Sequence, residues 1–193
     1  MKKQIVQFGI IIIILIICIA GYTILSGHYD KKEKKEKTSN QIVAFSLDDY
    51  KNTKSLKYTN QNETIDLTKE NGTWEIKGDS KTKVDGTKVE SEMLSKLVEV
   101  IASEKIDKVS KEENYGFIKS DDNVAASTCT IKIVDSEGNE HTLYIGNSNP
   151  YDSDKYYMMV KGDDNVYVIN SDLTNAFSKS KDDLKKEEET TTK

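Results

Sequence analysis

The feature that most limits the fold is an uncharged run near the start of the chain, residues 5–25, which reads IVQFGIIIIILIICIAGYTIL. In a helix that rises about 1.5 Å per residue, this run is long enough to cross a hydrocarbon layer of about 30 Å. A cleaved signal peptide has a shorter apolar core followed by small residues, and a lipoprotein signal has a small residue before its cysteine, whereas Ile17 precedes Cys18 here. We therefore predict a tail at residues 1–4 and an uncleaved transmembrane anchor at residues 5–27.

A charged spacer, DKKEKKEKTSNQ at residues 30–41, follows the apolar run and predicts a solvated stalk over residues 28–41. Lysines lie on both sides of the run: two precede it and five stand in the spacer. The positive-inside rule applied to these lysines favours a cytoplasmic domain, but long domains cross the membrane largely regardless of charge. The residues alone therefore leave the orientation of the domain open.

Beyond the spacer the chain is acidic. Seven of its 28 lysines and three of its 33 acidic residues lie before residue 38, so the remainder carries 21 lysines and 30 acids. The chain contains no arginine, whose planar guanidinium makes most bidentate contacts to phosphates and bases, and we expect no nucleic-acid partner. The two cysteines, Cys18 and Cys129, stand in the anchor and beyond it, which excludes a disulfide within the domain.

The part of the chain after the stalk shows mainly strand and turn signals. TIDLTKENGTWEIKG at residues 64–78 has Asn-Gly between two alternating segments, the strongest short signal for a β-hairpin. STCTIKIVDSEGNEHTLYIGN at residues 127–147 alternates apolar and polar residues on both sides of a turn, which predicts a hairpin with one face in the core. KYYMMVKGDDNVYVIN at residues 155–170 predicts another hairpin, whose strands are covered on both faces.

Two helices are predicted among these strands. Thr87 and Glu90 have the spacing of a capping box, and a helix of about four turns follows, with apolar residues at every third or fourth position: Val89, Met93, Leu97, Val100 and Ile101. SDLTNAF at residues 171–177 predicts a short helix, and the charged residues 179–193 predict a disordered tail. The expected fold class is therefore α+β: behind the transmembrane helix, residues 42–178 form a mostly antiparallel β domain of hairpins with one main amphipathic helix and a short C-terminal helix.

The residue pattern indicates no particular reaction. His141, the only histidine beyond the stalk, follows a hairpin turn, and the chain has no G-x-S-x-G motif. Cys129 falls on the inward face of its strand, where a thiol is normally inert. Acidic pairs occur at residues 121–122, 152–154 and 163–164, but none has the spacing of an EF-hand. We expect these pairs to form turns, and calcium binding is the alternative. We predict no enzyme activity, no cofactor and no metal site.

Tyrosines gather in the second half of the chain. Such side chains suit contacts with peptides or glycans, and they equally suit ordinary strands. The functional interpretation is an exposed interaction surface formed by three of them: Tyr144, Tyr151 and Tyr167.

Several segments in a fixed order resemble the DUF4340 family of bacterial envelope proteins: NGTWEIKGD, ENYGF, LYIGNSNP, DKYYMMV and NVYVIN. The resemblance spans residues 40–178. Its ENYGF segment matches the Y-G-L element of the family, with phenylalanine in place of leucine. The glycine permits a tight turn, and the two aromatic rings can fill the core between the helix and the hairpins. The resemblance thus implies a structural role for seven motif residues: Trp74, Tyr115, Gly116, Phe117, Gly146, Tyr156 and Tyr157.

Members of this family are membrane-anchored or secreted, and some are similar to auxiliary components of ABC transporters. The resemblance therefore implies an extracytoplasmic domain on a single-pass anchor in the plasma membrane. The function expected from it is a non-enzymatic interaction or auxiliary role in an envelope complex, with an ABC-transporter component as a candidate partner. The alternative is an extracytoplasmic module that binds a glycan or a peptide.

Overall fold

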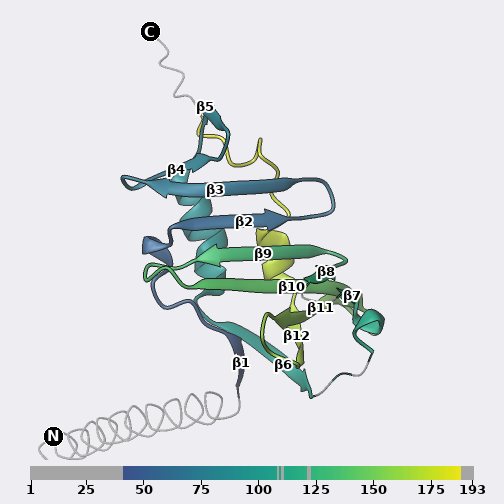
Figure 1. Ribbon diagram of the computed structural model, residues 1–193. Coiled ribbons are helices and arrows are strands. Elements are labelled where there is room, and N and C mark those ends of the chain that lie inside the picture. The colour runs from purple at the N-terminus through teal and green to yellow at the C-terminus, as the bar shows by residue number, and fades with distance from the viewer. Residues whose placement is uncertain (1–40, 108, 110, 121–122, 188–193) are drawn as a thin grey trace, which may run out of the picture. The chain divides into compact units, whose positions relative to one another are not determined.

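The computed structural model describes residues 41–107, 109, 111–120 and 123–187 (Figure 1). The predicted tail and anchor, and all but the last residue of the predicted stalk, lie outside the described residues. Within the described ranges, no helix is long and apolar enough to cross a membrane. The described residues from Ile42 onward belong to one compact unit.

Most of this unit is one large antiparallel sheet, with strands in the order β1-β6-β12-β11-β10-β9-β2-β3-β4-β5. A separate two-stranded sheet consists of β7 (Phe117–Ser120) and β8 (Asn123–Ala126). The described part of the chain thus confirms a mostly antiparallel β architecture with few helices. The strands of the large sheet are β1 (Ile42–Phe45), β2 (Ser55–Thr59), β3 (Thr64–Glu70), β4 (Thr73–Ile76), β5 (Asp79–Lys83), β6 (Val100–Ile106), β9 (Cys129–Val134), β10 (Glu140–Asn149), β11 (Asp152–Val160) and β12 (Val166–Asn170). The helical segments are η1 (Tyr50–Asn52), η2 (Lys88–Met93), η3 (Leu94–Leu97), η4 (Glu112–Tyr115) and α2 (Asp172–Ala176), the last of which confirms the predicted short helix.

The hairpins form where local residues suit the turns. Asn71 and Gly72 join β3 to β4 with φ angles of 49° and 81°, and two successive positive φ values are typical of the type I′ turn between adjacent strands. Between β9 and β10, Oδ1 of Asp135 accepts the main-chain N–H groups of residues 137–139 at 2.8–2.9 Å. The structure confirms the hairpins predicted at residues 64–78, 127–147 and 155–170.

The main helix is shorter than the apolar pattern predicts. It passes through η2 and η3 and ends at Leu97. Val100 and Ile101, predicted on its apolar face, instead begin β6 and pair with β1. Val and Ile are β-branched and pack well on a pleated surface, so this segment forms a strand where β1 is available to pair with it.

The predicted capping box at the start of the helix is also wrong. Oδ1 of Asp85 accepts the N–H of Thr87 at 2.9 Å, and the Glu90 carboxylate turns away from the helix end. Its Oε1 accepts hydrogen bonds from Nε1 of Trp74 at 3.0 Å and Nζ of Lys69 at 2.6 Å. Burial raises the pKa of Glu90, but these two donors outweigh burial, and the pKa lies below its ordinary value. Glu90 therefore connects the helix to the β3–β4 hairpin.

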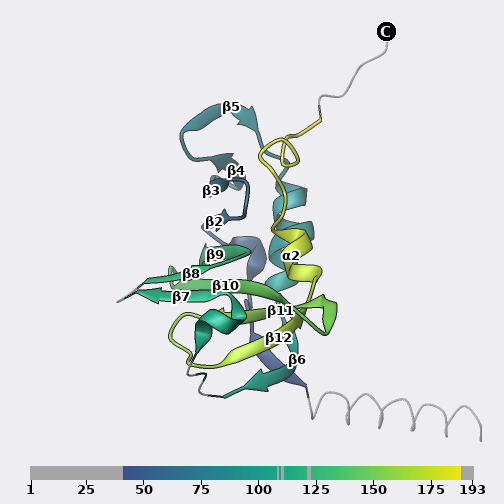
Figure 2. The same ribbon diagram turned by 90° about the vertical axis from the view of Figure 1, so that its right-hand side faces the viewer.

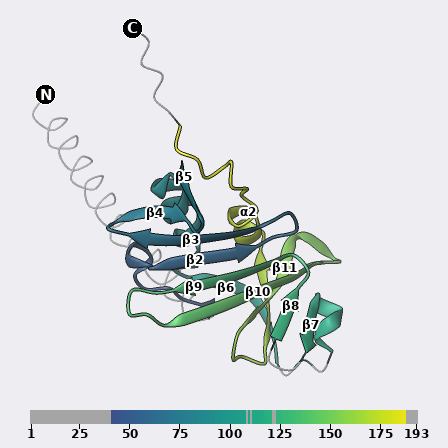
Figure 3. The same ribbon diagram turned by 45° about the horizontal axis from the view of Figure 1, so that its top comes forward.

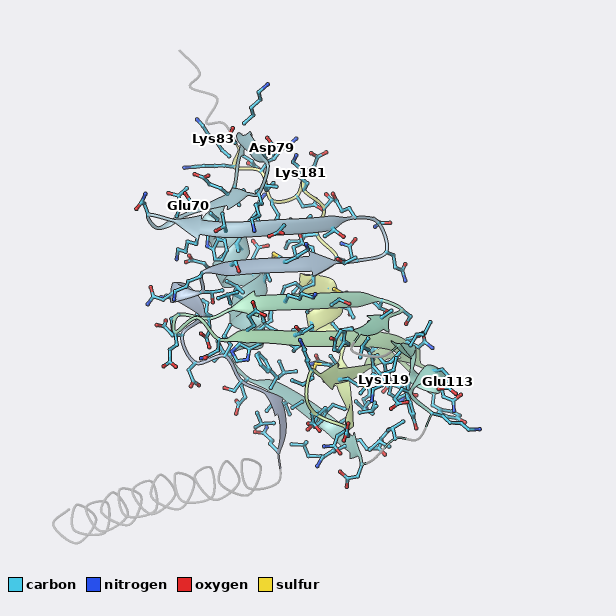
Figure 4. All side chains as sticks on the ribbon, viewed as in Figure 1. Glu70, Asp79, Lys83, Glu113, Lys119 and Lys181 are labelled. Carbon is cyan, nitrogen blue, oxygen red and sulfur yellow. The ribbon has the colours of Figure 1, made fainter. Side chains whose placement is uncertain are left out.

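The C-terminal segment corrects the prediction of a disordered tail. Within residues 179–187, Leu184 is fully buried and its carbonyl accepts the N–H of Asp85 at 2.8 Å. Lys181 also forms an ion pair with Asp79, and both are labelled in Figure 4. The buried leucine, main-chain hydrogen bonds and ion pairs together hold this charged segment against the domain. The rest of the predicted tail lies outside the described residues.

Different elements pack on the two faces of the large sheet. In Figure 2 the main helix and α2 lie on one side, here called the inner face, and β7 and β8, with the short η4 before them, lie on the other, the outer face. The inner core contains Trp74, Met93, Leu94 and Phe177 among its buried residues. A second core lies between β7–β8 and the outer face of β10–β12, which confirms that the β11–β12 hairpin is covered on both faces; its members are Phe117, Tyr144, Tyr157, Met159, Val166 and Val168.

Candidate functional site

The outer face of the sheet is divided into a covered half and an open half. β7 and β8 lie over the half that β10–β12 form. On the other half, β2, β9 and the start of β10 carry lysines and threonines, and Figures 1 and 3 show β2 and β3 without a covering element among the described residues. We call this open half, with its rim, the outer groove; it is defined by Lys57, Asp66, Val124, Thr130, Lys132 and Lys161.

A corner built from the Tyr-Gly-Phe motif positions β7 and β8. η4 ends at Tyr115 and is followed by Gly116, whose φ of 88° lies in the left-handed region that favours glycine. Phe117 then enters the second core against Gly146, where an added Cβ would lie only 2.8 Å from Cζ of Phe117. Tyr115 packs edge-on against Tyr157 with ring centroids 4.8 Å apart. These contacts hold the β7–β8 hairpin, and therefore one wall of the outer groove, against the sheet.

The remaining predicted residues are dispersed. Trp74 is fully buried in the inner core, and Tyr156 is half-buried. Tyr151 is 96% exposed in the turn between β10 and β11, but Tyr144 and Tyr167 are each 6% exposed and belong to cores on opposite faces. The predicted surface of three tyrosines therefore does not form, because the sheet directs two of them into different cores.

A row of polar side chains crosses the floor of the outer groove. The strand register places Asp66 opposite Lys57, Lys57 opposite Lys132, and Lys132 opposite Thr142. The N–H of Lys161 donates to the carbonyl of Thr142 at 2.8 Å and extends the row to the turn after β11. Neighbouring strands lie about 4.8 Å apart, so the row from Lys57 to Lys161 covers about 15 Å.

Adjoining hollows run along this row. Their volumes are about 350, 240 and 260 Å³. The first two share Lys57 and Lys132, and the third shares Val124 with the second and Lys161 with the first. Val124 on β8 stands on one side, and the β11–β12 turn that starts at Lys161 stands on the other. The three hollows therefore adjoin one another along the row of polar side chains.

The charged residues that line the hollows are Lys57, Lys77, Lys119, Lys132 and Lys161 together with Asp66, Glu140, Asp163 and Asp164. Nζ of Lys57 lies 3.3 Å from Oδ2 of Asp66, and Nζ of Lys119 on β7 (Figure 4) lies 2.8 Å from Oε1 of Glu112. In the described part of the chain, neither Lys132 nor Lys161 has an acidic oxygen within 4.0 Å. An anion in the groove would therefore meet ammonium groups that are free to bind it.

Lys57 and Lys132 carry only part of their signal in the sequence. The alternation in SLKYT and CTIKIV indicates that Lys57 and Lys132 point away from the core. No local signal shows that β2 pairs with β9, and this pairing is what brings the two side chains together.

The candidate catalytic residues lie apart from one another. Nε2 of His141 lies 2.9 Å from Oδ2 of Asp135, and the imidazole packs edge-on against Phe45 at 5.5 Å between centroids. Cys129 is buried, and burial raises the pKa of its thiol to about 12, so the thiol stays protonated near neutral pH. The register places Cys129 and His141 at opposite ends of the β9–β10 pairing.

The described acidic pairs serve turns. Oδ1 of Asp163 accepts the N–H of Asn165 at 3.0 Å, and Oδ1 of Asp152 accepts the N–H of Asp154 at 3.2 Å. No three side chains of the metal-ligating types converge within the described ranges. These contacts favour the turn interpretation for both pairs, whereas the pair at residues 121–122 lies outside the described residues.

Comparisons with known proteins give one match. No curated protein and no solved structure matches the chain. The sequence profile of the family described as Domain of unknown function (DUF4340) matches residues 74–191. The match begins at Trp74 in β4 and includes the main helix, the Tyr-Gly-Phe corner, the later hairpins and the C-terminal segment, whereas β1–β3 lie before it. The match contains the motifs from WEIKGD onward and lacks only residues 71–73 of the first one. Because it covers more than half of the chain, the chain belongs to the DUF4340 family.

Proposed function

We propose that this chain is a non-enzymatic interaction protein of the cell envelope. Residues 5–27 hold it in the plasma membrane as a single-pass anchor, residues 28–41 act as a stalk, and the β domain stands on the extracytoplasmic side. A partner protein binds the outer groove. The resemblance to envelope proteins makes an ABC-transporter component the candidate class of partner.

The open half of the outer face is the observation that carries this proposal. The β7–β8 hairpin already buries the apolar half, so the open half does not need a cover for stability. What remains is a walled groove with adjoining hollows, lined by polar groups on rigid strands. Strands hold side chains in fixed positions, which suits selective binding.

Labelling of an introduced cysteine tests the location. Tyr151 is almost fully exposed, so a cysteine at this position is accessible from solvent. In a chain that also carries Cys18→Ser, we expect Tyr151→Cys to react with a membrane-impermeant maleimide in intact cells. Labelling only after the cells are broken would place the domain in the cytoplasm and contradict the proposal.

Site-specific photocrosslinking tests the interaction. A photoreactive amino acid replaces Thr59, which is exposed on the floor of the groove, and the control variant carries it at Val98, which is exposed after η3 and outside the groove. We expect the Thr59 variant to form a covalent adduct with one envelope protein in intact cells, identified by mass spectrometry. Absence of this adduct, or equal yield from Val98, would refute the groove as the contact surface.

A smaller hollow supports the alternative of glycan or peptide binding. It has a volume of about 230 Å³, and the amide side chains of Asn60, Asn62 and Asn175 line it together with Tyr156. Amides beside an aromatic ring suit such ligands. Calorimetric titration with soluble cell-wall fragments tests this function: a saturable heat that Tyr156→Ala abolishes supports it, and no heat with the unaltered chain contradicts it.

A further inference from the structure

We propose that the outer groove recognises an acidic peptide segment of its partner protein, with carboxylates at the middle of the segment and neutral or basic residues at both ends. This inference rests on the proposed function, in which a protein occupies the groove. It adds the chemistry of the segment that binds and the residues that select it.

Two lysines repel each other at the centre of the floor. Lys57 and Lys132 are direct cross-strand partners, and both side chains point to the outer face. Like charges directly opposite each other destabilise a sheet. Asp66 lies 3.3 Å from Lys57 and relieves part of this repulsion, but no acid in the described part of the chain lies within 4.0 Å of Lys132. A carboxylate bound between the two ammonium groups would remove the remaining repulsion.

The length of the positive row suits a short extended segment. Lys161 lies two strands beyond Lys132, next to Thr142, so the three lysines extend over about 15 Å. An extended chain covers about 3.3 Å per residue, so about five residues of a bound segment pass over the row. Alternate side chains of that segment point to the floor, which places about three carboxylates near the lysines.

Acidic side chains lie at the two ends of the row. Asp66 lies at one end, and Asp163 and Asp164 line the hollow at the other. Lys77 and Glu140 also line the first hollow, outside the row itself. A polymer with a phosphate in every repeat would bring negative charge against these carboxylates. A peptide can place neutral or basic side chains at both ends, so the order of charges in the groove favours a protein segment. The positive row also stands out locally, because the chain beyond the spacer carries 21 lysines and 30 acids.

A binding experiment with the full chain tests this inference. The probe is a fluorescein-labelled peptide of about ten residues with acidic residues at its centre and lysines at its ends, and the matched peptide has the same composition with the acids at the ends. We expect saturable anisotropy with the first peptide, at least tenfold weaker binding of the second, and weaker binding at higher salt.

Charge reversal at one lysine provides the matched variants. Lys132→Glu should weaken binding of the first peptide at least tenfold, whereas Lys96→Glu, on the exposed side of η3, should leave it within about twofold. Lys132→Glu places a carboxylate opposite Lys57, so its melting temperature should equal or exceed that of the unaltered chain. This readout separates loss of binding from loss of folding.

Three outcomes would overturn the inference: equal affinity for the two peptides, no effect of Lys132→Glu, or preferential binding of linear polyphosphate used as a competitor. The last would assign the groove to phosphate polymers. If the Thr59 crosslink forms but Lys132→Glu does not reduce it, the groove binds a protein by other chemistry, so the proposed function stands while this inference fails. If the crosslink is absent, the proposed function itself fails.

Discussion

Gly146→Ala tests whether the Tyr-Gly-Phe corner depends on a close approach of two chain segments. An added Cβ at this position would lie 2.8 Å from Cζ and 2.9 Å from Cε1 of Phe117, and closer still to the carbonyl of Tyr115. The carbonyl belongs to the backbone and Phe117 is fully buried, so neither group can move away without disturbing the second core. Such overpacking costs about 1–3 kcal/mol, and contact with two fixed groups places this variant at the upper end, about 3 kcal/mol.

Urea unfolding of the full chain measures this cost. Trp74, the only tryptophan, is buried in the inner core, so its fluorescence reports unfolding of the domain. With a denaturant slope of about 2 kcal/mol per molar urea, a loss of about 3 kcal/mol lowers the midpoint by about 1.5 M.

Gly86→Ala is the matched control. A Cβ at Gly86 would meet Cδ1 of Trp74 at 3.4 Å, an ordinary contact, and alanine lowers the entropy of the unfolded chain. Its midpoint should therefore stay the same or rise. Equal midpoints for Gly146→Ala and the unaltered chain would refute the argument that the corner requires glycine at residue 146.

Other positions give independent tests. Leu184→Ala should lower the free energy of unfolding by about 2–3 kcal/mol in the same urea assay, because Leu184 is fully buried; no change would show that the C-terminal segment does not pack in solution. The hydrogen bond from His141 lowers the pKa of Asp135, so this carboxylate stabilises the fold above its unfolded pKa of about 3.9 and loses that effect as the pH falls further. Between about pH 5 and pH 2 the urea concentration at the unfolding midpoint should therefore fall more steeply for the unaltered chain than for Asp135→Asn. Parallel plots of this midpoint against pH would contradict the reasoning. In the Cys18→Ser variant, the buried Cys129 should react with a thiol reagent at pH 8 only when urea unfolds the chain; rapid reaction of the folded chain would contradict its burial.

Local turn chemistry let the sequence predict most of the fold of the described residues. Asn71 and Gly72 adopt the two positive φ angles that their types favour, and this fixes the β3–β4 hairpin without help from distant residues. Alternation around the later turns likewise predicts the β9–β10 and β11–β12 hairpins, and the order of motifs predicts the family. Each turn and each alternating strand depends on residues only a few positions apart, so it can be predicted from one sequence.

Packing between distant segments decided where the helix ends and what the C-terminal segment does. The apolar spacing continues to Ile101, but strand pairing with β1 takes Val100 and Ile101 into β6. The charge of residues 179–187 predicts disorder, but a site in the inner core accepts Leu184. The space that Leu184 fills exists only once the sheet has assembled, so neither the periodicity nor the composition of the sequence can reveal it.

The candidate groove also exists only in the tertiary structure. By itself the sequence determined that Lys57 and Lys132 point away from the core, because each stands between apolar neighbours on its strand. Only the strand order placed them opposite each other, with Lys161 in the same row. The same order placed Tyr144 beneath β7 and β8 and so removed it from the surface. The physical reason is that alternation sets the direction of a side chain, whereas its neighbours depend on pairing between strands that lie far apart in the chain.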